Sequence, residues 1–367
     1  MTITEQPTTH GSKTSAPAID EGALMAFLQQ VAGHQAFALN ATLAYLGDRL
    51  GLWRTLADSR PTTSADLAER TGTAERYLRE WLAAQAAAGY LSYDPANQTF
   101  RLPPEHAAVL ADDDSPAALI GCFETIVATA ATADRLAHAF VTGEGIGWHE
   151  QDPRVFSGVE RFFRPLYANS LLTEWLPAVD GLVARLEAGI DVLDVGCGLG
   201  TPTLQLAEAF PNSRFVGVDY HAESIRRATA TASRRGLSDR VRFVQVDAEE
   251  YTGTFDLVLM FDALHDLGDP VGALRHAAAR LAPGGVVVAI EPAAADRLED
   301  NLHPLGLSWY ASSTALCVPN SLSQDVGAAL GSQAGTARLV DVFAQAGLRG
   351  RAAATTMFNV VLEGRLP

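Results

Sequence analysis

The chain has 367 residues, 48% of them hydrophobic and 19% charged, which favours two domains and is typical of a globular enzyme. The formal net charge of −16 disfavours a nucleic-acid partner, because a protein that binds DNA or RNA must neutralise phosphates. No run of about eighteen apolar residues occurs, so we expect no membrane partner, and three widely spaced cysteines predict a reducing, cytoplasmic location without disulfides.

Residues 1–20 are rich in Thr, Ser and Pro and are expected to form a disordered tail. Residues 21–112 then show a helical pattern followed by two short alternating runs, 90–93 and 99–102, that predict a hairpin. Thr63 or Ser64 is a candidate N-cap for one of the helices. The order helix, turn, helix, hairpin predicts a winged helix.

A winged helix often binds DNA, but the second helix, 74–88, carries little positive charge. Its cations are Arg76 and Arg79, beside Glu75 and Glu80. We therefore expect a dimerisation domain that covers the substrate and makes the protein a homodimer.

Residues 113–186 are predicted to form a helical linker or lid between the domains. Arg161, Arg164 and Tyr167 lie together near its end and are candidate substrate-binding residues. An arginine binds a carboxylate through two parallel hydrogen bonds. The alternative is a surface helix whose arginines reach into solvent.

From residue 190 short apolar strands alternate with amphipathic helices, which predicts an α/β domain over 187–367. The strand 190–195 leads into a loop with Gly196, Gly198 and Gly200. Glycines allow a tight turn and a close approach of the backbone to a ligand. Asp194, two residues before the first glycine, is suited to a ligand with positive charge.

Further acidic residues follow the next strands. Asp219 ends the strand 215–218, where a carboxylate can accept hydrogen bonds from both hydroxyls of a ribose. Asp247 and Ala248 follow a third strand, at the expected place of an adenine. A Leu-Ala-Pro-Gly-Gly turn at 281–285 precedes a strand at 286–290.

Together these motifs resemble the class I methyltransferases that use S-adenosylmethionine (SAM). The resemblance implies a Rossmann-like, seven-stranded sheet with helices on both faces. A nicotinamide dehydrogenase is the main rival, but it usually has the spacing GxGxxG, and the turn at 281–285 is unexplained by it. The SAM-binding residues that the resemblance implies are Asp194, Gly196, Gly198, Gly200, Asp219, Asp247, Ala248 and Phe261.

The strand 256–260 ends in a loop that contains His265 and Asp266, at the edge of the sheet where α/β enzymes bind ligands. With the winged helix in front, the chain resembles the two-domain small-molecule methyltransferases of plants and actinobacteria. In the O-methylating members the matching histidine is the general base, and this role falls on His265. An imidazole is suitable for removing a hydroxyl proton near neutral pH.

A second histidine, His303, follows shortly after Glu291. His265, Asp266 and His303 would make a two-histidine, one-carboxylate site for zinc or iron. This resembles the metal-dependent α-keto acid C-methyltransferases of antibiotic biosynthesis, in which the metal stabilises an enolate. Glu291 is expected to support His265. We therefore expect β-carbon methylation of an α-keto acid, with metal-free O-methylation and a SAM-sensing DNA-binding regulator as the alternatives.

Overall fold

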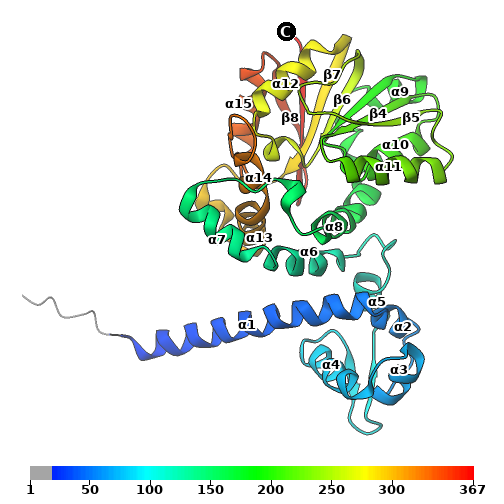
Figure 1. The fold of residues 1–367 in the computed structure, drawn as a ribbon, viewed down its shortest axis with the longest axis vertical. Helices are drawn as coiled ribbons and strands as arrows, with labels where there is room; N and C mark the ends of the chain where they lie inside the picture. Colours follow the sequence, from blue (N-terminus) through cyan, green and yellow to red (C-terminus); the bar gives the residue numbers. More distant parts are fainter. Residues whose placement is uncertain (1–18) are drawn as a thin grey trace, which may run out of the picture.

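A computed structural model describes residues 19–367 (Figure 1). The predicted tail at 1–20 lies almost wholly outside the described residues. Asp20 is inside them and caps the first helix by accepting a hydrogen bond from the Ala23 backbone. None of the helices in the described part of the chain is long and apolar enough to cross a bilayer.

The predicted winged helix is present below the sheet domain in Figure 1. It comprises α2 (Leu52–Leu56), α3 (Ser64–Thr71), α4 (Glu75–Ala87), the antiparallel strands β1 (Ser92–Asp94) and β2 (Thr99–Arg101), and α5 (Pro104–Leu110). Thr63 caps α3 together with Asp66, as predicted. Trp53 and Trp81 pack in its core with ring centroids 4.8 Å apart.

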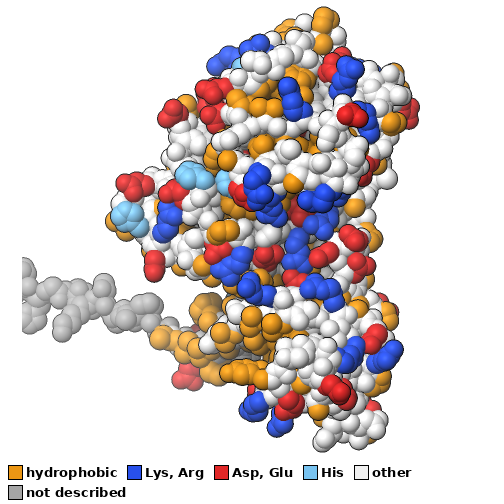
Figure 2. Space-filling model, turned by 45° about the vertical axis from the view of Figure 1, so that its right-hand side comes forward, with side chains coloured by type: hydrophobic (Ala, Val, Ile, Leu, Met, Phe, Trp, Pro, Cys, Tyr) orange, Lys and Arg blue, Asp and Glu red, His pale blue; other side chains and the backbone are white. Residues whose placement is uncertain are grey.

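The long helix α1 (Glu21–Arg49) precedes the winged helix. Its last turns are packed: Asn40, Ala41, Ala44 and Asp48 are buried. Its first two-thirds extend away from the rest of the chain and expose large apolar side chains (Figures 1 and 2). A helix with an uncovered apolar surface of this kind is normally buried by a partner.

A layer of helices lies between the winged helix and the sheet domain. It contains α6 (Gly121–Ala130), α7 (Ala133–Thr142), α8 (Arg154–Ser170) and α9 (Leu182–Ala188). Arg161 of α8 binds Asp48 of α1 at 2.7 Å, Asp113 at 2.7 Å and Glu124 of α6 at 3.1 Å. The guanidinium therefore connects the winged-helix side of the molecule to the helices that lie against the sheet domain.

The C-terminal domain is the predicted seven-stranded sheet, in the order β5-β4-β3-β6-β7-β9-β8. The strands are β3 (Asp191–Val195), β4 (Arg214–Asp219), β5 (Val241–Gln245), β6 (Phe255–Phe261), β7 (Leu281–Pro292), β8 (Arg349–Thr355) and β9 (Asn359–Arg365). The first five are parallel, and β9 pairs antiparallel with both β7 and β8. Apolar clusters fill both faces, which is why β6 is apolar from Leu257 to Phe261 and β7 from Val286 to Ile290.

Helices cover this sheet on both sides: α10 (Thr201–Ala209), α11 (Ala222–Arg234), α12 (Pro270–Ala279) and α15 (Thr336–Gln345), with α13 (Pro304–Ser312) and α14 (Val318–Leu322) near the middle layer (Figure 1). The predicted turn at 281–285 is a bulge at the start of β7. Leu281 pairs with Phe255, whereas the next pair is Val286 with Leu257, so the residues between leave the register.

We predict that Arg161→Gln lowers the free energy of unfolding by about 3–5 kcal/mol, because it removes the only ion-pair partner of the shielded Glu124 carboxylate among the described residues and leaves Asp48 with Arg54 alone. Urea denaturation followed by circular dichroism measures the loss. Arg76→Gln is the control: it breaks a solvent-exposed pair with Glu80 and should cost about 0.5 kcal/mol or less. Equal stability of the Arg161 variant and the native protein would contradict the structural role.

Candidate functional site

The glycine loop after β3 forms the floor of the site. Gly196, Gly198 and Gly200 all have positive φ angles, of 73°, 51° and 75°. A Cβ on Gly200 would lie 2.4 Å from the Phe243 ring, and one on Gly196 would lie 2.9 Å from the Ala263 Cβ. Both the backbone conformation and the space available therefore require glycine here.

Two predicted carboxylates support this loop. Asp219 accepts hydrogen bonds from the Gly198 N–H at 2.9 Å and the His221 N–H at 2.8 Å, one on each oxygen. Burial raises its pKa, and these hydrogen bonds oppose the shift. Asp194 accepts a hydrogen bond from the Thr203 hydroxyl through Oδ2, while its buried Oδ1 has no partner. Burial is the main reason that the pKa of Asp194 rises to about 7.

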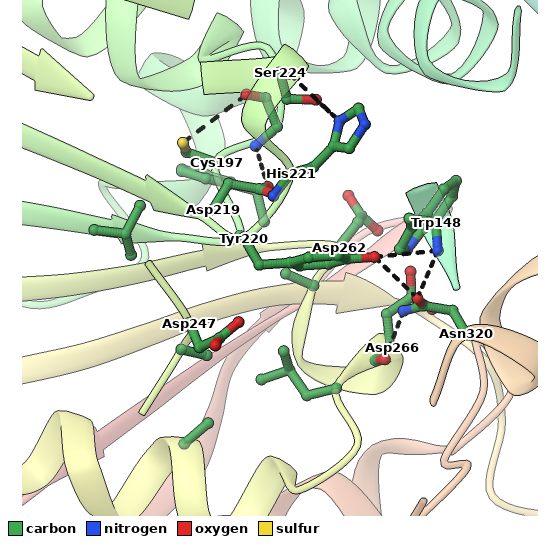
Figure 3. Close-up of a pocket in the computed structure, with 18 of the residues that line it drawn as sticks. Trp148, Cys197, Asp219, Tyr220, His221, Ser224, Asp247, Asp262, Asp266 and Asn320 are labelled. Atoms are coloured by element: carbon green, nitrogen blue, oxygen red, sulfur yellow. Dashed lines mark hydrogen bonds between the residues drawn. The ribbon is translucent and has the colours of Figure 1, made fainter. Parts of the chain in front are cut away.

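A cavity of about 650 Å³ opens above the loop, at the carboxyl ends of the parallel strands (Figure 3). The predicted site residues that line it are Tyr167, Gly196, Gly198, Asp219, Asp247, Ala248, Phe261 and Asp266. Four further predicted residues do not line the cavity: Asp194, Gly200, His265 and Glu291. Figure 3 shows Asp219 and Asp247 on one side of the cavity and Trp148, Asp262, Asp266 and Asn320 on the other.

His265 lies between two carboxylates at the end of β6. Its Nδ1 is bound to Glu291, a fully buried residue of β7, and its Nε2 lies 3.3 Å from Asp266 Oδ1. The other oxygen of Glu291 accepts hydrogen bonds from the backbone N–H groups of Leu264 at 2.9 Å and Ala263 at 3.3 Å. Glu291 therefore supports His265, the role that the sequence predicted for it.

The charges explain which protonation states this group favours. Burial alone would lower the pKa of His265, but the carboxylates of Asp266 and Glu291 outweigh it and raise the pKa well above its usual value. Burial raises the pKa of Asp266, and the His265 imidazolium opposes that shift. The imidazole ring thus holds a proton between Glu291 and the cavity-lining Asp266.

The structure does not bring His303 into this group. His303 caps α13, where its Nδ1 accepts a hydrogen bond from the Gly306 N–H at 3.2 Å. Among residues 19–367, the donor atoms close enough to share a metal ion here belong to His265, Asp266 and Cys317, within 4.8 Å of one another. The predicted trio of His265, Asp266 and His303 is therefore not assembled, because the histidine after β7 serves as a helix cap.

Arg161 and Arg164 also differ from expectation, since neither lines the cavity. Arg161 is saturated by its three carboxylates, and Arg164 binds Glu160 of the same helix through two hydrogen bonds, at 2.9 and 2.5 Å. Both guanidinium groups bind the protein's own carboxylates. Tyr167, the third predicted substrate-binding residue, does face the cavity.

Sequence reasoning missed several residues of the cavity wall. Asp262 directly follows β6 and Tyr220 follows Asp219, so their places at strand ends were a usable signal. Trp148 and Asn320 come from distant segments that only the fold joins: the Trp148 N–H lies 3.1 Å from both Asn320 Oδ1 and the Tyr220 hydroxyl. The Asn320 amide in turn donates to the Asp266 carbonyl at 3.0 Å.

Comparison with known families agrees with this geometry. Residues 186–341 match the family described as "Methyltransferase domain", and residues 38–112 match the "Rv2258c-like winged HTH domain". Residues 186–341 are a methyltransferase domain. The winged helix in front of it is of the Rv2258c-like type, which agrees with both parts of the predicted architecture.

Individual relatives resemble parts of the chain. The trans-aconitate 2-methyltransferase of Deinococcus radiodurans is 36% identical over 111 residues, which are 30% of this chain and 41% of that protein. The curated relatives are matched over about a quarter to a half of their own length.

Solved structures resemble nearly the whole chain at low sequence identity. An O-methyltransferase family protein from Burkholderia thailandensis has a TM-score of 0.69 at 18% identity, covering 95% of this chain and 99% of that one. Human N-acetylserotonin methyltransferase in complex with SAM has a TM-score of 0.67 at 18% identity, with coverages of 97% and 99%. These likenesses establish a common fold for the two domains and the helices between them.

We predict that Asp219→Ala weakens binding of S-adenosylhomocysteine, the demethylated product of SAM, by tenfold or more. Each oxygen of Asp219 keeps a lone pair for a ribose hydroxyl, and a hydrogen bond to a charged group is worth about 1.5–3 kcal/mol. Calorimetry gives the affinity. Asp239→Ala, on the exposed surface, is the control and should bind normally. Unchanged affinity of the Asp219 variant would remove the ribose assignment.

Proposed function

We propose that this protein is a SAM-dependent methyltransferase that acts on a small molecule of specialised metabolism. The observation that carries the proposal is one continuous cavity, which joins the glycine loop and Asp219 to the proton-holding group at Asp266. Three free cysteines suit a reducing compartment such as the cytoplasm.

The chain's residues fit SAM at one end of this cavity. Asp219 is placed for the ribose, Asp247 and Ala248 for the adenine, and the backbone of Gly196 and Gly198 for the amino-acid part. The unpartnered oxygen of Asp194, behind the loop, adds negative charge on the side of the ammonium. When bound, SAM supplies a methyl group on a positively charged sulfur, a built-in leaving group, so that positioning the acceptor supplies much of the catalysis.

At the other end, Asp266 is the cavity-lining carboxylate beside His265 and faces the acceptor. A hydroxyl or amine acceptor must lose a proton, and Asp266 is placed to accept it, with His265 behind it. His265 is 5% exposed and acts through Asp266 as a positioning and proton-holding residue. Glu291 fixes the ring by binding the opposite nitrogen.

Two observations make this heteroatom methylation our preferred mechanism over β-carbon methylation of an α-keto acid. The keto-acid reaction needs His265, Asp266 and His303 around one metal ion, but His303 caps α13 instead. It also needs a positive group for the substrate carboxylate, and none of the described residues that line the cavity is Lys or Arg. The metal-assisted reaction can still be tested with a different set of ligands, because His265, Asp266 and Cys317 have donor atoms close enough to share one metal ion.

An acceptor is first identified by the transfer of an isotope-labelled methyl group from SAM. With that acceptor, we predict that chelators leave the rate of methyl transfer unchanged. His265→Ala should lower kcat by about 10²–10⁴-fold, because Asp266 then loses the neighbouring ring that orients it. His303→Ala is the control and should retain activity. The metal-assisted reaction would instead be supported by stoichiometric bound metal, by loss of turnover with chelator, and by exchange of the β-protons of phenylpyruvate with deuterated water in the absence of SAM.

We also propose that the protein is a homodimer and that α1 forms its interface. The exposed side chains that support this are Leu24, Met25, Phe27, Leu28, Val31 and Phe37. Figure 2 shows them as a continuous apolar surface. A second copy presents the same surface, so a two-fold axis would bury both. The alternative use of this domain, reading DNA, has little support, since Arg76 and Arg79 of α4 pair with Glu80 and Glu75.

We predict a dimer at micromolar concentration by sedimentation velocity, and a folded monomer for the double variant Phe27→Glu, Val31→Glu. The two charges lie on one face of α1 and would be buried without partners in the dimer. Tyr77→Glu, at an aromatic position on α4 that is more exposed than Phe27 and Val31, is the control and should stay dimeric. A native monomer, or a dimeric double variant, would rule out this interface.

A further inference from the structure

The wall of the cavity, taken over both of its ends, has an unusual balance of charge. Nine residues of the cavity wall are Asp or Glu, and none of the lining residues in the described part of the chain is Lys or Arg. One of the nine, Glu160, is neutralised from outside by Arg164, and Asp219 is placed for the ribose. The remaining wall is negative, so an anionic acceptor would find no counter-charge there.

Asp262 is the carboxylate in this wall that most needs a ligand. Its Oδ1 receives only a long hydrogen bond, 3.4 Å, from the Asn359 side chain, and its Oδ2 is buried without any partner. Its φ angle of 47° lies in the left-handed region, which side chains other than Gly, Asn and Asp seldom adopt. A buried carboxylate oxygen without a partner is rare in a folded protein and points to a ligand that completes it.

The groups around the Asp262 carboxylate show from which side a positively charged partner can reach it. Burial raises the pKa of Asp262, and the negative charges of Glu291 and Asp266 raise it further. The positive charge of His265 opposes this shift. His265 is already bound by Glu291 and faces Asp266. The positive partner that Asp262 lacks must therefore come from the cavity itself.

Aromatic side chains complete this end of the cavity: Trp148, Phe156, Phe163, Tyr167, Tyr220 and Phe261. Trp148 and Phe156 lie 6.0 Å apart by ring centroids, and Tyr167 and Phe261 lie 5.8 Å apart. Rings of this kind stack on a flat acceptor, and their faces attract a cation. Carboxylate and aromatic groups in one pocket are the usual combination for recognising an organic ammonium.

We propose that the acceptor is an aromatic molecule that carries a cationic amine, with its ammonium bound by Asp262 and its ring among Trp148, Phe156 and Tyr220. This inference rests on the proposed function, because it assigns the acceptor half of the same cavity. The ammonium neutralises the buried carboxylate, so that neither charge is left unpaired. It also gives a reason for the absence of arginine and lysine from the wall.

The test uses the full-length protein saturated with S-adenosylhomocysteine, which lacks the charge on sulfur. Calorimetry or ligand-detected NMR compares two matched series of probes. One is tyramine, 4-ethylphenol and 3-(4-hydroxyphenyl)propionate; the other is tryptamine, 3-ethylindole and indole-3-propionate. We expect the amine of each series to bind about tenfold more tightly than the neutral member, and the acid to bind most weakly.

Asp262→Asn is the decisive variant, because asparagine keeps the shape and tolerates the positive φ angle. It should weaken the amines by about tenfold and leave the neutral probes within about twofold. Asp325→Asn, an exposed carboxylate at the rim of the same cavity, is the matched control and should leave the amine preference intact.

Three results would overturn the inference: no amine binds, the acids or neutral probes bind as well as the amines, or Asp262→Asn weakens SAM but not the amines. The last would assign Asp262 to the sulfonium of SAM. Binding of S-adenosylhomocysteine itself separates the two proposals. If it binds but no amine preference follows, only this inference fails; if it does not bind, the methyltransferase proposal fails as well.

Discussion

The geometry of the site depends on Glu291, an acidic residue with no exposed surface near the carboxyl end of β7. One oxygen receives the backbone N–H groups of Ala263 and Leu264, and the other binds the ring of His265. A buried carboxylate is costly unless its lone pairs are used, and here three donors use them. The same contacts fix the path of the chain after β6, and with it the direction of Asp262 and Asp266.

The cavity wall is assembled from segments that are far apart in the chain. The loop before α8 supplies Trp148, and the helix α14 supplies Asn320, whose side chain links the Trp148 backbone to the Asp266 carbonyl. The glycine loop and the strand ends supply the opposite side. The sheet thus carries the half of the cavity proposed for SAM. The half proposed for the acceptor depends also on helices that the methyltransferase family match, residues 186–341, includes only in part.

Local sequence signals were enough to predict the half of the cavity that the sheet carries, but not the half that the helices complete. Glycines with positive φ and acids at strand ends are determined by a few neighbouring residues, so the loop at 196–200, Asp219 and Asp247 were predictable. The seven-stranded sheet was implied by the resemblance to class I methyltransferases, whereas the order of its strands comes from the structure.

The roles of Arg161 and His303 could not be inferred from their neighbours in sequence. Three carboxylates from separate segments bind Arg161, and the helix that begins at Pro304 uses the His303 ring as its cap. Asp262 shows a different limitation. Its position after β6 was visible in the sequence, but its unsatisfied oxygen and positive φ angle depend on the folded loop. A motif therefore places a functional residue more reliably than it assigns a partner to it.

The helix α8 contacts both the cavity and the helix α1. On one face Phe156, Val159 and Phe163 line the cavity, and on another Arg161 binds the end of α1 through Asp48. The helix α8 therefore links α1 directly to the cavity wall. Thermodynamic linkage makes such an effect reciprocal: if assembly through α1 shifts α8, then an acceptor that fills the cavity changes the strength of self-association by the same factor. In such a protein the apparent affinity for the substrate depends on the protein concentration.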